Sequence, residues 1–220
     1  MKNIFNKWLG GSTIFFWIAI TLLIIHSSSC NRGIATFTLS GTITDATFAK
    51  GLEGATLKLY KKMITTGDEI LMETKILAAD GKYEFTFERE KVEKYFIRIS
   101  KPLYFDIDEE IQFSSLTPSS NNIRNYSTKA KSWVELRFVN NSMQPSDHLR
   151  FIKFEGKENC LECCPADQMD LYGSSYYSRI CINDALSLYS IYYQVIGTTN
   201  QNVVEVVTQP FDTTLLLVNY

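Results

Sequence analysis

Alternation of apolar and polar side chains is the feature that most constrains the fold of this chain. It recurs in four runs, at residues 37–43, 55–60, 83–88 and 95–100. A period of two places one set of side chains in a core and the other in solvent, as in half-buried β-strands. Turn-forming residues separate the runs, for example at Gly51–Gly54 and Asp80–Gly81. No segment of this region has a clear helical period, so we expect it to be all-β.

A second β-rich region follows a polar stretch. Residues 116–131 hold Pro118 among Ser, Asn and Thr, a composition typical of a linker. Further strand candidates lie beyond it, at residues 132–138, 188–196, 203–207 and 214–218. A chain of this length accommodates two domains of ordinary size. We therefore expect an all-β protein with two small β-sandwich domains, at residues 36–115 and 132–220, joined by a linker at 116–131.

The order of motifs in the first region resembles that of a known sandwich family. Ser40-Gly41-Thr42-Ile43 comes first, Gly54-Ala55-Thr56-Leu57-Lys58-Leu59 second, and Asp80-Gly81-Lys82-Tyr83-Glu84-Phe85 third. In this order they resemble the transthyretin-like, carboxypeptidase-regulatory-like domain, over roughly residues 36–115. The resemblance implies an Ig-like or transthyretin-like sandwich with a structural or adhesive role and no active site of its own. The polar segment 61–74 departs from the family's pattern and leaves the sheet order open.

The first thirty residues have the layout of an export signal. Lys2 and Lys7 precede an uncharged apolar run at 14–25, and Ser27-Ser28-Ser29 then lead to Cys30. The run is shorter than the about 20 apolar residues that span a bilayer. With Cys30 at the boundary, the segment resembles a lipoprotein signal peptide of the Bacteroidetes type. The resemblance implies removal of residues 1–29 and fatty acylation of Cys30, with palmitate as a typical group. Ser27 departs from the aliphatic residue more usual there, and an uncleaved anchor or a soluble secreted product are the alternatives.

The same resemblance predicts where the protein lies. Five residues, 31–35, separate Cys30 from the first strand, and they reach at most about 18 Å. The first domain should therefore lie close to the membrane that holds the acylated Cys30. The residues after Cys30 lack the acidic cluster of a surface-export signal, which favours an outer-membrane protein that faces the periplasm. Without Lys2 and Lys7 the 22 basic residues fall to 20 against 24 acidic ones, which argues against nucleic acid as a partner.

Four further cysteines form the most distinctive cluster of the chain: Cys160, Cys163, Cys164 and Cys181. In an exported protein they are predicted to form two disulfides. A bond between adjacent cysteines is strained, so we expect Cys181 to join Cys163 or Cys164 and Cys160 to take the other. A bridge that closes about 18 residues stabilises a fold by about 3 kcal/mol in the chain-entropy model.

Two sharper interpretations of the cysteines are a zinc site and a thiol redox site. Cys160 and Cys163 have the spacing of a zinc knuckle, but the sequence holds no second closely spaced pair of ligands. A redox Cys-x-x-Cys normally opens a helix in a βαβ context, which this sequence does not offer. We therefore predict no metal and no cofactor.

Other motifs do not indicate catalysis. Gly173-Ser174-Ser175 is not a nucleophile elbow, which requires Gly-x-Ser-x-Gly. The acidic run 106–110 lacks the spacing of a calcium loop and is typical of a charged strand edge.

We therefore expect a lipid-anchored, non-catalytic protein of the bacterial cell envelope that scaffolds or binds another envelope protein. The alternatives are a small-ligand or glycan-binding protein, which would use Tyr172, Tyr176 and Tyr177, and a thiol redox or metal protein that would use the cysteines.

Overall fold

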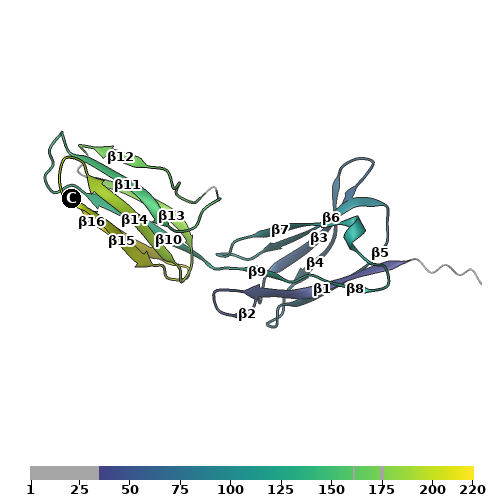
Figure 1. Ribbon diagram of the computed structural model, residues 1–220. Helices are drawn as coiled ribbons and strands as arrows, with labels where there is room; N and C mark the ends of the chain where they lie inside the picture. Colours follow the sequence, from purple (N-terminus) through teal and green to yellow (C-terminus); the bar gives the residue numbers. More distant parts are fainter. Residues whose placement is uncertain (1–34, 161, 174–175) are drawn as a thin grey trace, which may run out of the picture.

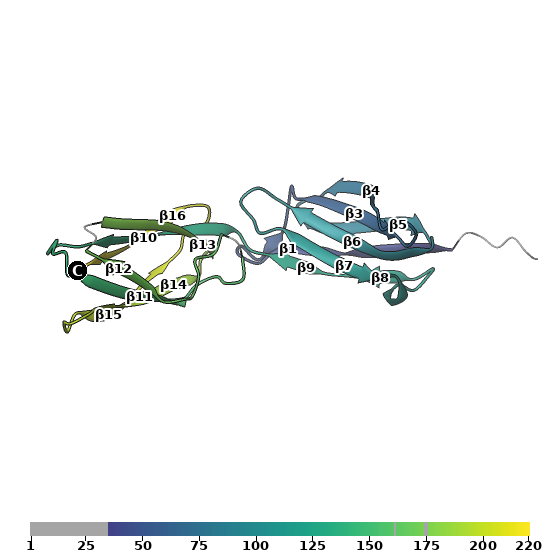
Figure 2. The same cartoon turned by 90° about the horizontal axis from the view of Figure 1, so that it is seen from above.

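The computed structural model describes residues 35–160, 162–173 and 176–220. These residues form β-strands, turns and a single 3₁₀ turn, Phe113–Ser115. The strands build two β-sandwiches that lie one beyond the other along the molecule (Figures 1 and 2). The prediction of an all-β, two-sandwich protein is confirmed. Cys30 and the signal segment lie outside the described residues, so their prediction stays a prediction.

The first sandwich has one sheet centred on its first strand and a second sheet of four strands. The first sheet comprises β1 (Thr36–Asp45), β2 (Lys50–Gly51), β5 (Lys82–Glu88), β8 (Asn121–Ile123) and β9 (Tyr126–Thr128). In it, β1 pairs antiparallel with β2 and β5 and parallel with β8 and β9. The second sheet has the order β4–β3–β6–β7, with β3 (Thr56–Met63), β4 (Glu69–Ile76), β6 (Val92–Ser100) and β7 (Ile107–Gln112).

The second sandwich is built in the same way. One sheet places β10 (Lys131–Val139) between antiparallel β13 (Tyr176–Asp184) and parallel β16 (Thr213–Asn219). The other sheet has the order β12–β11–β14–β15, with β11 (His148–Glu155), β12 (Met169–Tyr172), β14 (Leu188–Val195) and β15 (Gln201–Val207).

The two sandwiches share one strand topology. If the two-residue β2 is set aside, the fourth, first and last strands of each form one sheet, and the third, second, fifth and sixth form the other. Strand β10 thus corresponds to β1, β13 to β5, β14 to β6, and β16 to the split pair of β8 and β9. Sequence reasoning did not find this repeat, because the two halves share alternation but no common motif.

Each sandwich has its own hydrophobic core. Phe37, Phe85 and Ile97 lie in the first core, and Phe138, Leu149 and Ile191 in the second. They are contributed by both sheets of their sandwich, because alternate residues of each strand point inward. The alternation in the sequence therefore corresponds directly to the two cores.

The structure differs from the predicted linker at residues 116–131. This stretch holds β8 and β9, and two residues separate β9 from β10. Asn122 is buried, where its side chain accepts from the Thr117 amide (2.8 Å) and donates to the Thr38 carbonyl (2.9 Å). Three-residue strands show no periodicity, and their pairing depends on β1, which is distant in sequence.

The polar segment 61–74, which left the sheet order open in the sequence, is part of the second sheet of the first sandwich. It contains the end of β3, a turn and most of β4, which form a hairpin at the edge of the second sheet. Most side chains of β4 are exposed, so the strand lacks the apolar alternation that identifies half-buried strands. The acidic run 106–110 lies mainly on β7 at the opposite edge, as the sequence predicts.

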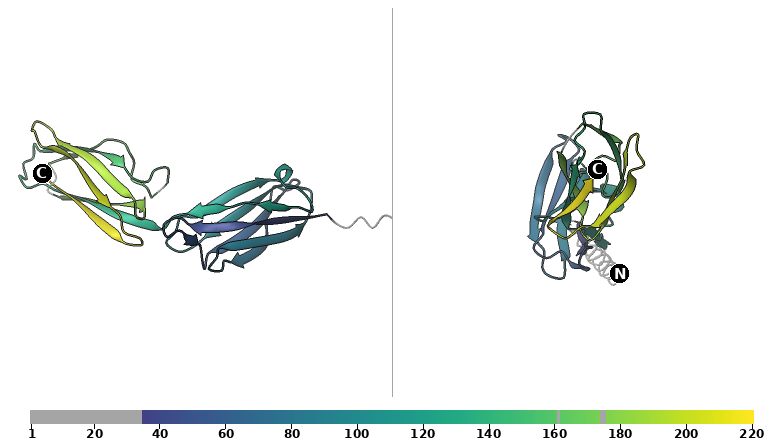
Figure 3. Two further views of the ribbon diagram at one scale, coloured as in Figure 1. Left: turned by 60° about the horizontal axis from the view of Figure 1, so that its bottom comes forward. Right: turned by 90° about the vertical axis from the view of Figure 1, so that its left-hand side faces the viewer.

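The two sandwiches lie end to end (Figure 3), and aromatic and charged side chains make contacts between them. The Phe211 ring from the second lies 5.5 Å from the Tyr104 ring and 6.1 Å from the Phe48 ring of the first. Asp184 accepts hydrogen bonds from Lys129, which follows β9 (3.1 Å), and from Lys157 of its own sandwich (2.7 Å). The Lys157 Nζ in turn lies 3.9 Å from the centre of the Phe105 ring of the first sandwich. The sandwiches therefore meet in a packed junction.

Candidate interaction surface

The solvent-facing side of the β13–β10–β16 sheet is unusually apolar. We define this surface, the β10 face, by the outward residues from the row of Trp133 onward. They are Trp133, Glu135, Arg137 and Val139 on β10, Tyr176, Ser178, Ile180 and Ile182 on β13, and Thr213, Leu215, Leu217 and Asn219 on β16. Ile180 is 61% exposed, Leu215 42% and Leu217 45%. The register places Glu135 between Ile180 and Leu215 in one row, so the exposed side chains form a continuous surface.

The corresponding surface of the first sandwich is polar. Outward residues of β1 and β5 include Thr38, Thr42, Glu84 and Thr86, and β8 adds Asn121. Ile123, 60% exposed, is the large apolar exception. The two surfaces occupy the same place in the same topology, so the fold itself does not require an apolar β10 face. Contiguous exposed apolar side chains usually mark a binding site.

One ion pair neutralises the charge on the β10 face. Arg137 donates to both carboxylate oxygens of Glu135 (2.8 and 2.7 Å), and the Ser178 hydroxyl donates to the same carboxylate (2.8 Å). The hydrogen bond from Arg137 holds the pKa of Glu135 below its usual value. The carboxylate therefore stays ionised and paired, and the pair leaves the face without net charge.

An open groove of about 540 Å³ lies at the end of the β10 face next to the first sandwich. We call it the Trp133 groove. Apolar residues Trp133, Ile180, Ile182 and Leu103 line it together with Lys131, Arg179, Glu162 and Cys163. Apolar side chains combined with charges of both signs are compatible with the binding of a protein.

A disulfide-bonded loop contributes Glu162 and Cys163 to the lining of the groove. Cys160 bonds to Cys163, and Cys164 bonds to Cys181 on β13. The Ile182 amide donates to the Glu162 carbonyl at 3.3 Å, so the loop also covers the outer edge of β13. Of the two connectivities that the sequence left open, the structure has the one that joins Cys181 to Cys164.

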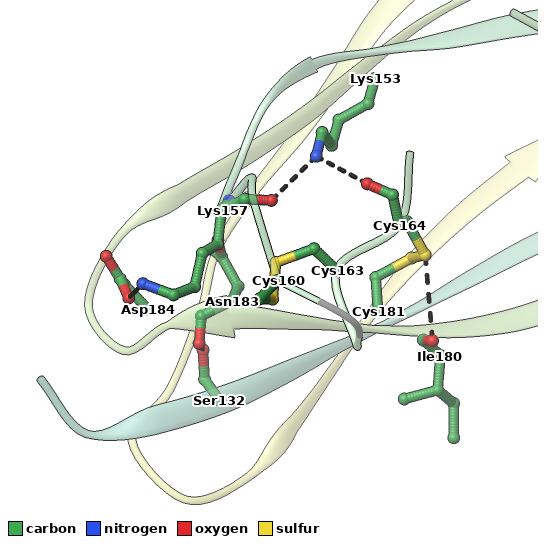
Figure 4. Close-up of a disulfide and its surroundings, with 10 residues drawn as sticks. All are labelled: Ser132, Lys153, Lys157, Cys160, Cys163, Cys164, Ile180, Cys181, Asn183 and Asp184. Carbon is green, nitrogen blue, oxygen red and sulfur yellow. Dashed lines mark hydrogen bonds and ion pairs between the residues drawn. A yellow bond between two sulfur atoms is a disulfide. The ribbon is translucent and has the colours of Figure 1, made fainter. Parts of the chain in front are cut away.

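A buried lysine holds the loop from inside. The Lys153 side chain is 8% exposed, and its Nζ donates to the carbonyls of Lys157 (2.8 Å) and Cys164 (2.7 Å), as Figure 4 shows. Burial lowers the pKa of Lys153. The two carbonyls partly replace the water that the ammonium group loses, so this cation ties two ends of the loop together.

The three tyrosines predicted to bind a ligand do not form one site. Tyr176 and Tyr177 are neighbours on β13 and point to opposite faces, so that Tyr177 packs on Phe138 at 6.0 Å between ring centres. Tyr172 lies on β12 in the other sheet and stacks on His148 at 4.2 Å. The three tyrosines are close in sequence, but they lie in two different sheets and, within β13, on opposite faces.

The cysteines likewise do not offer thiolate ligands for a metal ion in this state. All four sulfur atoms are in disulfides, so none is available as a thiolate ligand. Across the part of the chain that the structure describes, no group of three or more His, Cys, Asp or Glu side chains is placed to hold a metal ion. His148 begins β11, where its Nε2 lies 2.5 Å from Asp170. The hydrogen bond from His148 lowers the pKa of Asp170 to about 2, and hydrogen bonds from Gln168 and Arg150 add to the effect. Asp170 is therefore part of a surface ion-pair network with His148 and Arg150.

The candidate acylation site, Cys30, is outside the described residues. Within those residues the structure contains no helix with the length and apolar character needed to cross a membrane.

Comparison with known proteins adds little to this description. No family model and no curated protein matches the chain. Among solved structures, a variant of the SpaA shaft pilin of Lactobacillus rhamnosus GG is 10% identical over 84% of this chain and 98% of its own, with a TM-score of 0.36. The minor pilin GBS52 of Streptococcus agalactiae is 11% identical over 83% of this chain and 94% of its own, with a TM-score of 0.34.

A third match, the Bacillus anthracis TIE protein, is 13% identical over 84% of this chain, with a TM-score of 0.35. This chain spans 34% of the length of that protein. TM-scores of this size carry no functional argument. The transthyretin-like and lipoprotein resemblances therefore stay predictions from the sequence.

Proposed function

We propose that this protein is a non-catalytic module of the bacterial cell envelope that binds another protein through the Trp133 groove. The supporting observation is the contrast between two equivalent surfaces. Exposed Ile180, Leu215 and Leu217 flank a neutralised ion pair on the β10 face, whereas the same surface of the first sandwich is polar. The shared topology places both surfaces in solvent. The exposure of apolar side chains to water is unfavourable, and a bound partner would remove this unfavourable exposure.

The chemistry of the groove suits a protein partner. Trp133 offers a large, rigid contact surface, and Trp is among the residues that dominate binding energy at protein interfaces. Lys131, Arg179 and Glu162 provide charges of both signs at the margin. A phosphate backbone would instead favour a surface of one positive sign.

Two observations support the envelope as the location. Disulfides persist in oxidising compartments and are rare in the cytosol, and this chain has two. The N-terminal segment resembles a lipoprotein signal, so Cys30 would carry the lipid anchor. Replacing Cys30 by Ala should release the protein from membranes. Retention of the C30A variant would instead indicate that the apolar run 14–25 is an uncleaved anchor.

Photo-crosslinking in intact cells tests the binding role. A photoreactive amino acid replaces Ile180 at the groove, and in a matched control it replaces exposed Thr86 on the corresponding strand β5. We expect one discrete crosslinked protein from position 180 and none from position 86. Trp133→Ala should then weaken binding of that purified partner by at least about tenfold. Equal crosslinking from both positions, or none from position 180, would contradict the proposal.

A further inference from the structure

The β13–β10–β16 sheet ends at an unprotected strand. β16 pairs through one edge with β10, and no other strand among the described residues pairs with its second edge. An edge of this kind presents free backbone N–H and C=O groups that can template another strand. The seven residues Thr213–Asn219 contain no charge, no proline and no glycine, and Leu215 and Leu217 are exposed.

The corresponding edge of the first sandwich is blocked. Its last strand is split into β8 and β9, and between them the Asn125 side chain, in place of a backbone carbonyl, accepts from the Thr42 amide at 2.9 Å. The chain passes so close to β1 that a Cβ on Gly41 would lie 1.8 Å from the Arg124 carbonyl oxygen. The neighbouring edge strand β7 carries Asp108, Glu109 and Glu110. Breaks and charges are the usual means by which natural sheets prevent edge pairing.

The remaining edges of the second sandwich are also protected. The disulfide loop bonds to β13 at Ile182 and β13 also carries Arg179, β12 is four residues long, and β15 carries Glu205. Among the described edges of this sandwich, β16 alone is long, uncharged and uncovered.

We propose that the occupant of this edge is a second copy of the same chain, which adds its own β16 antiparallel to form a continuous six-stranded sheet. Full overlap of the seven residues places Leu216 on a two-fold axis and Leu215 opposite the partner's Leu217. The outward leucines of the two copies then bury each other. The contact is isologous and closes on itself, so it yields a dimer rather than a filament.

Charge complementarity favours a second copy over other occupants. β16 is uncharged, and the only charged residues of the β10 face, Glu135 and Arg137, neutralise each other. Two identical surfaces therefore meet without like charges opposite one another, whereas a charged strand would find no counter-charge. The second sandwich already has all the strand positions of the first, and Leu216 and Val218 are buried. An added strand would extend this sandwich and is not needed to complete it.

A charge swap tests the dimer. In the purified full chain in detergent, sedimentation should show a concentration-dependent dimer. The double variant L215K/L217K and the double variant L215E/L217E should each be monomeric, because like charges then face each other across the two-fold axis. An equimolar mixture of the two should restore a heterodimer, which a merely misfolded variant cannot do. A monomeric unmodified protein, or no rescue in the mixture, would overturn the proposal.

Cysteine crosslinking tests the register. A mixture of L215C and L217C variants should form an intermolecular disulfide, whereas each variant alone should not. Matched variants of the first sandwich, N121C and I123C, should not crosslink in either arrangement. Crosslinking of L215C or L217C alone, or none in their mixture, would exclude the antiparallel register. The dimer does not depend on the proposed partner, since the photo-crosslink at position 180 and the charge swap at β16 can each fail independently.

Discussion

The two sandwiches share a topology but protect their surfaces in different ways. On the second sheet of the first sandwich, cross-strand ion pairs cover the outer side, with Lys94 bonded to Glu110 (2.6 Å) and Arg98 to Glu69 (2.8 Å) and Asp108 (3.1 Å). The second sandwich also has surface ion pairs, but it adds two disulfides and exposes large apolar side chains on its β10 face. Exposed ion pairs add little stability, so their main effect is to keep that surface soluble and unpaired. The difference indicates that the cores carry the fold, whereas the outer faces are free to acquire separate roles.

Removing the disulfide that joins the loop to β13 should produce the largest difference in stability between the two sandwiches. The double variant C164A/C181A opens a loop with a sequence separation of 17 and should destabilise the second sandwich by about 3 kcal/mol. The first sandwich has no cysteine between residues 36 and 128, so its transition should not move. Chemical denaturation, with fluorescence and near-UV circular dichroism as probes, would resolve the two transitions.

The second disulfide supplies the control for this experiment. C160A/C163A opens a loop with a sequence separation of 3 and should cost about 2 kcal/mol or less. Equal losses in the two double variants would show that the bridge to β13 contributes no more stability than the short bridge within the loop.

The junction between the sandwiches should have an intermediate effect. Asp184 is hydrogen-bonded to two lysines at the junction. Asp184→Asn should therefore lower the coupling free energy between the two sandwiches by about 2 kcal/mol, measured by calorimetry from their two unfolding transitions. The control is Asp108→Asn, whose exposed pair with Arg98 should be worth less than about 1 kcal/mol. Unchanged coupling in D184N would show that the aromatic contacts of Phe211 suffice.

The contribution of Asp184 to the stability of the junction should depend on pH. Burial raises the pKa of Asp184, but hydrogen bonds from Lys157 and Lys129 outweigh this effect and hold the pKa below its usual value. The carboxylate therefore stabilises the junction fully above the unfolded-state pKa of about 3.9, and the effect is lost as the pH falls through the lower folded-state pKa. The difference between D184N and the unmodified protein should disappear in acid. A difference that persists there would assign it to packing.

The smallest predicted effect concerns one buried tyrosine in each sandwich. Tyr95 on β6 and Tyr189 on the corresponding β14 are buried, and neither hydroxyl has a hydrogen-bond partner in the described structure. Burial raises the pKa of each to about 12. Tyr→Phe at either position should leave stability unchanged or raise it by up to about 1 kcal/mol in urea titrations.

Tyr83 provides the matched control for these tyrosines. Its hydroxyl donates to the Arg124 carbonyl at 2.8 Å, so Tyr83→Phe should destabilise by about 1 kcal/mol. If Y95F or Y189F loses a similar amount of stability, a bound water molecule forms a hydrogen bond with that hydroxyl.

Much of the fold could be predicted from the sequence, because the alternation of apolar and polar residues indicates which face of a strand is buried. Phe37, Leu39, Tyr83 and Phe85 alternate with polar residues and all lie in the first core. The segments that were misread lack this signal: β4 is mostly exposed, and β8 and β9 are three residues each. The candidate site was harder still. The sequence drew attention to the tyrosines and cysteines, whereas Trp133, Ile180 and Leu217 come from three strands distant in the chain.

The sequence by itself determined the all-β class, the presence of two cores, the charged edge at residues 106–110 and the restriction of disulfides to residues 160–181, because each depends on local composition or spacing. The tertiary structure decided the shared topology, the Cys164–Cys181 connectivity, the packed junction and the apolar face between β13 and β16. These features arise from which strands become neighbours. That choice depends on contacts between residues far apart in the chain, which a local pattern does not encode.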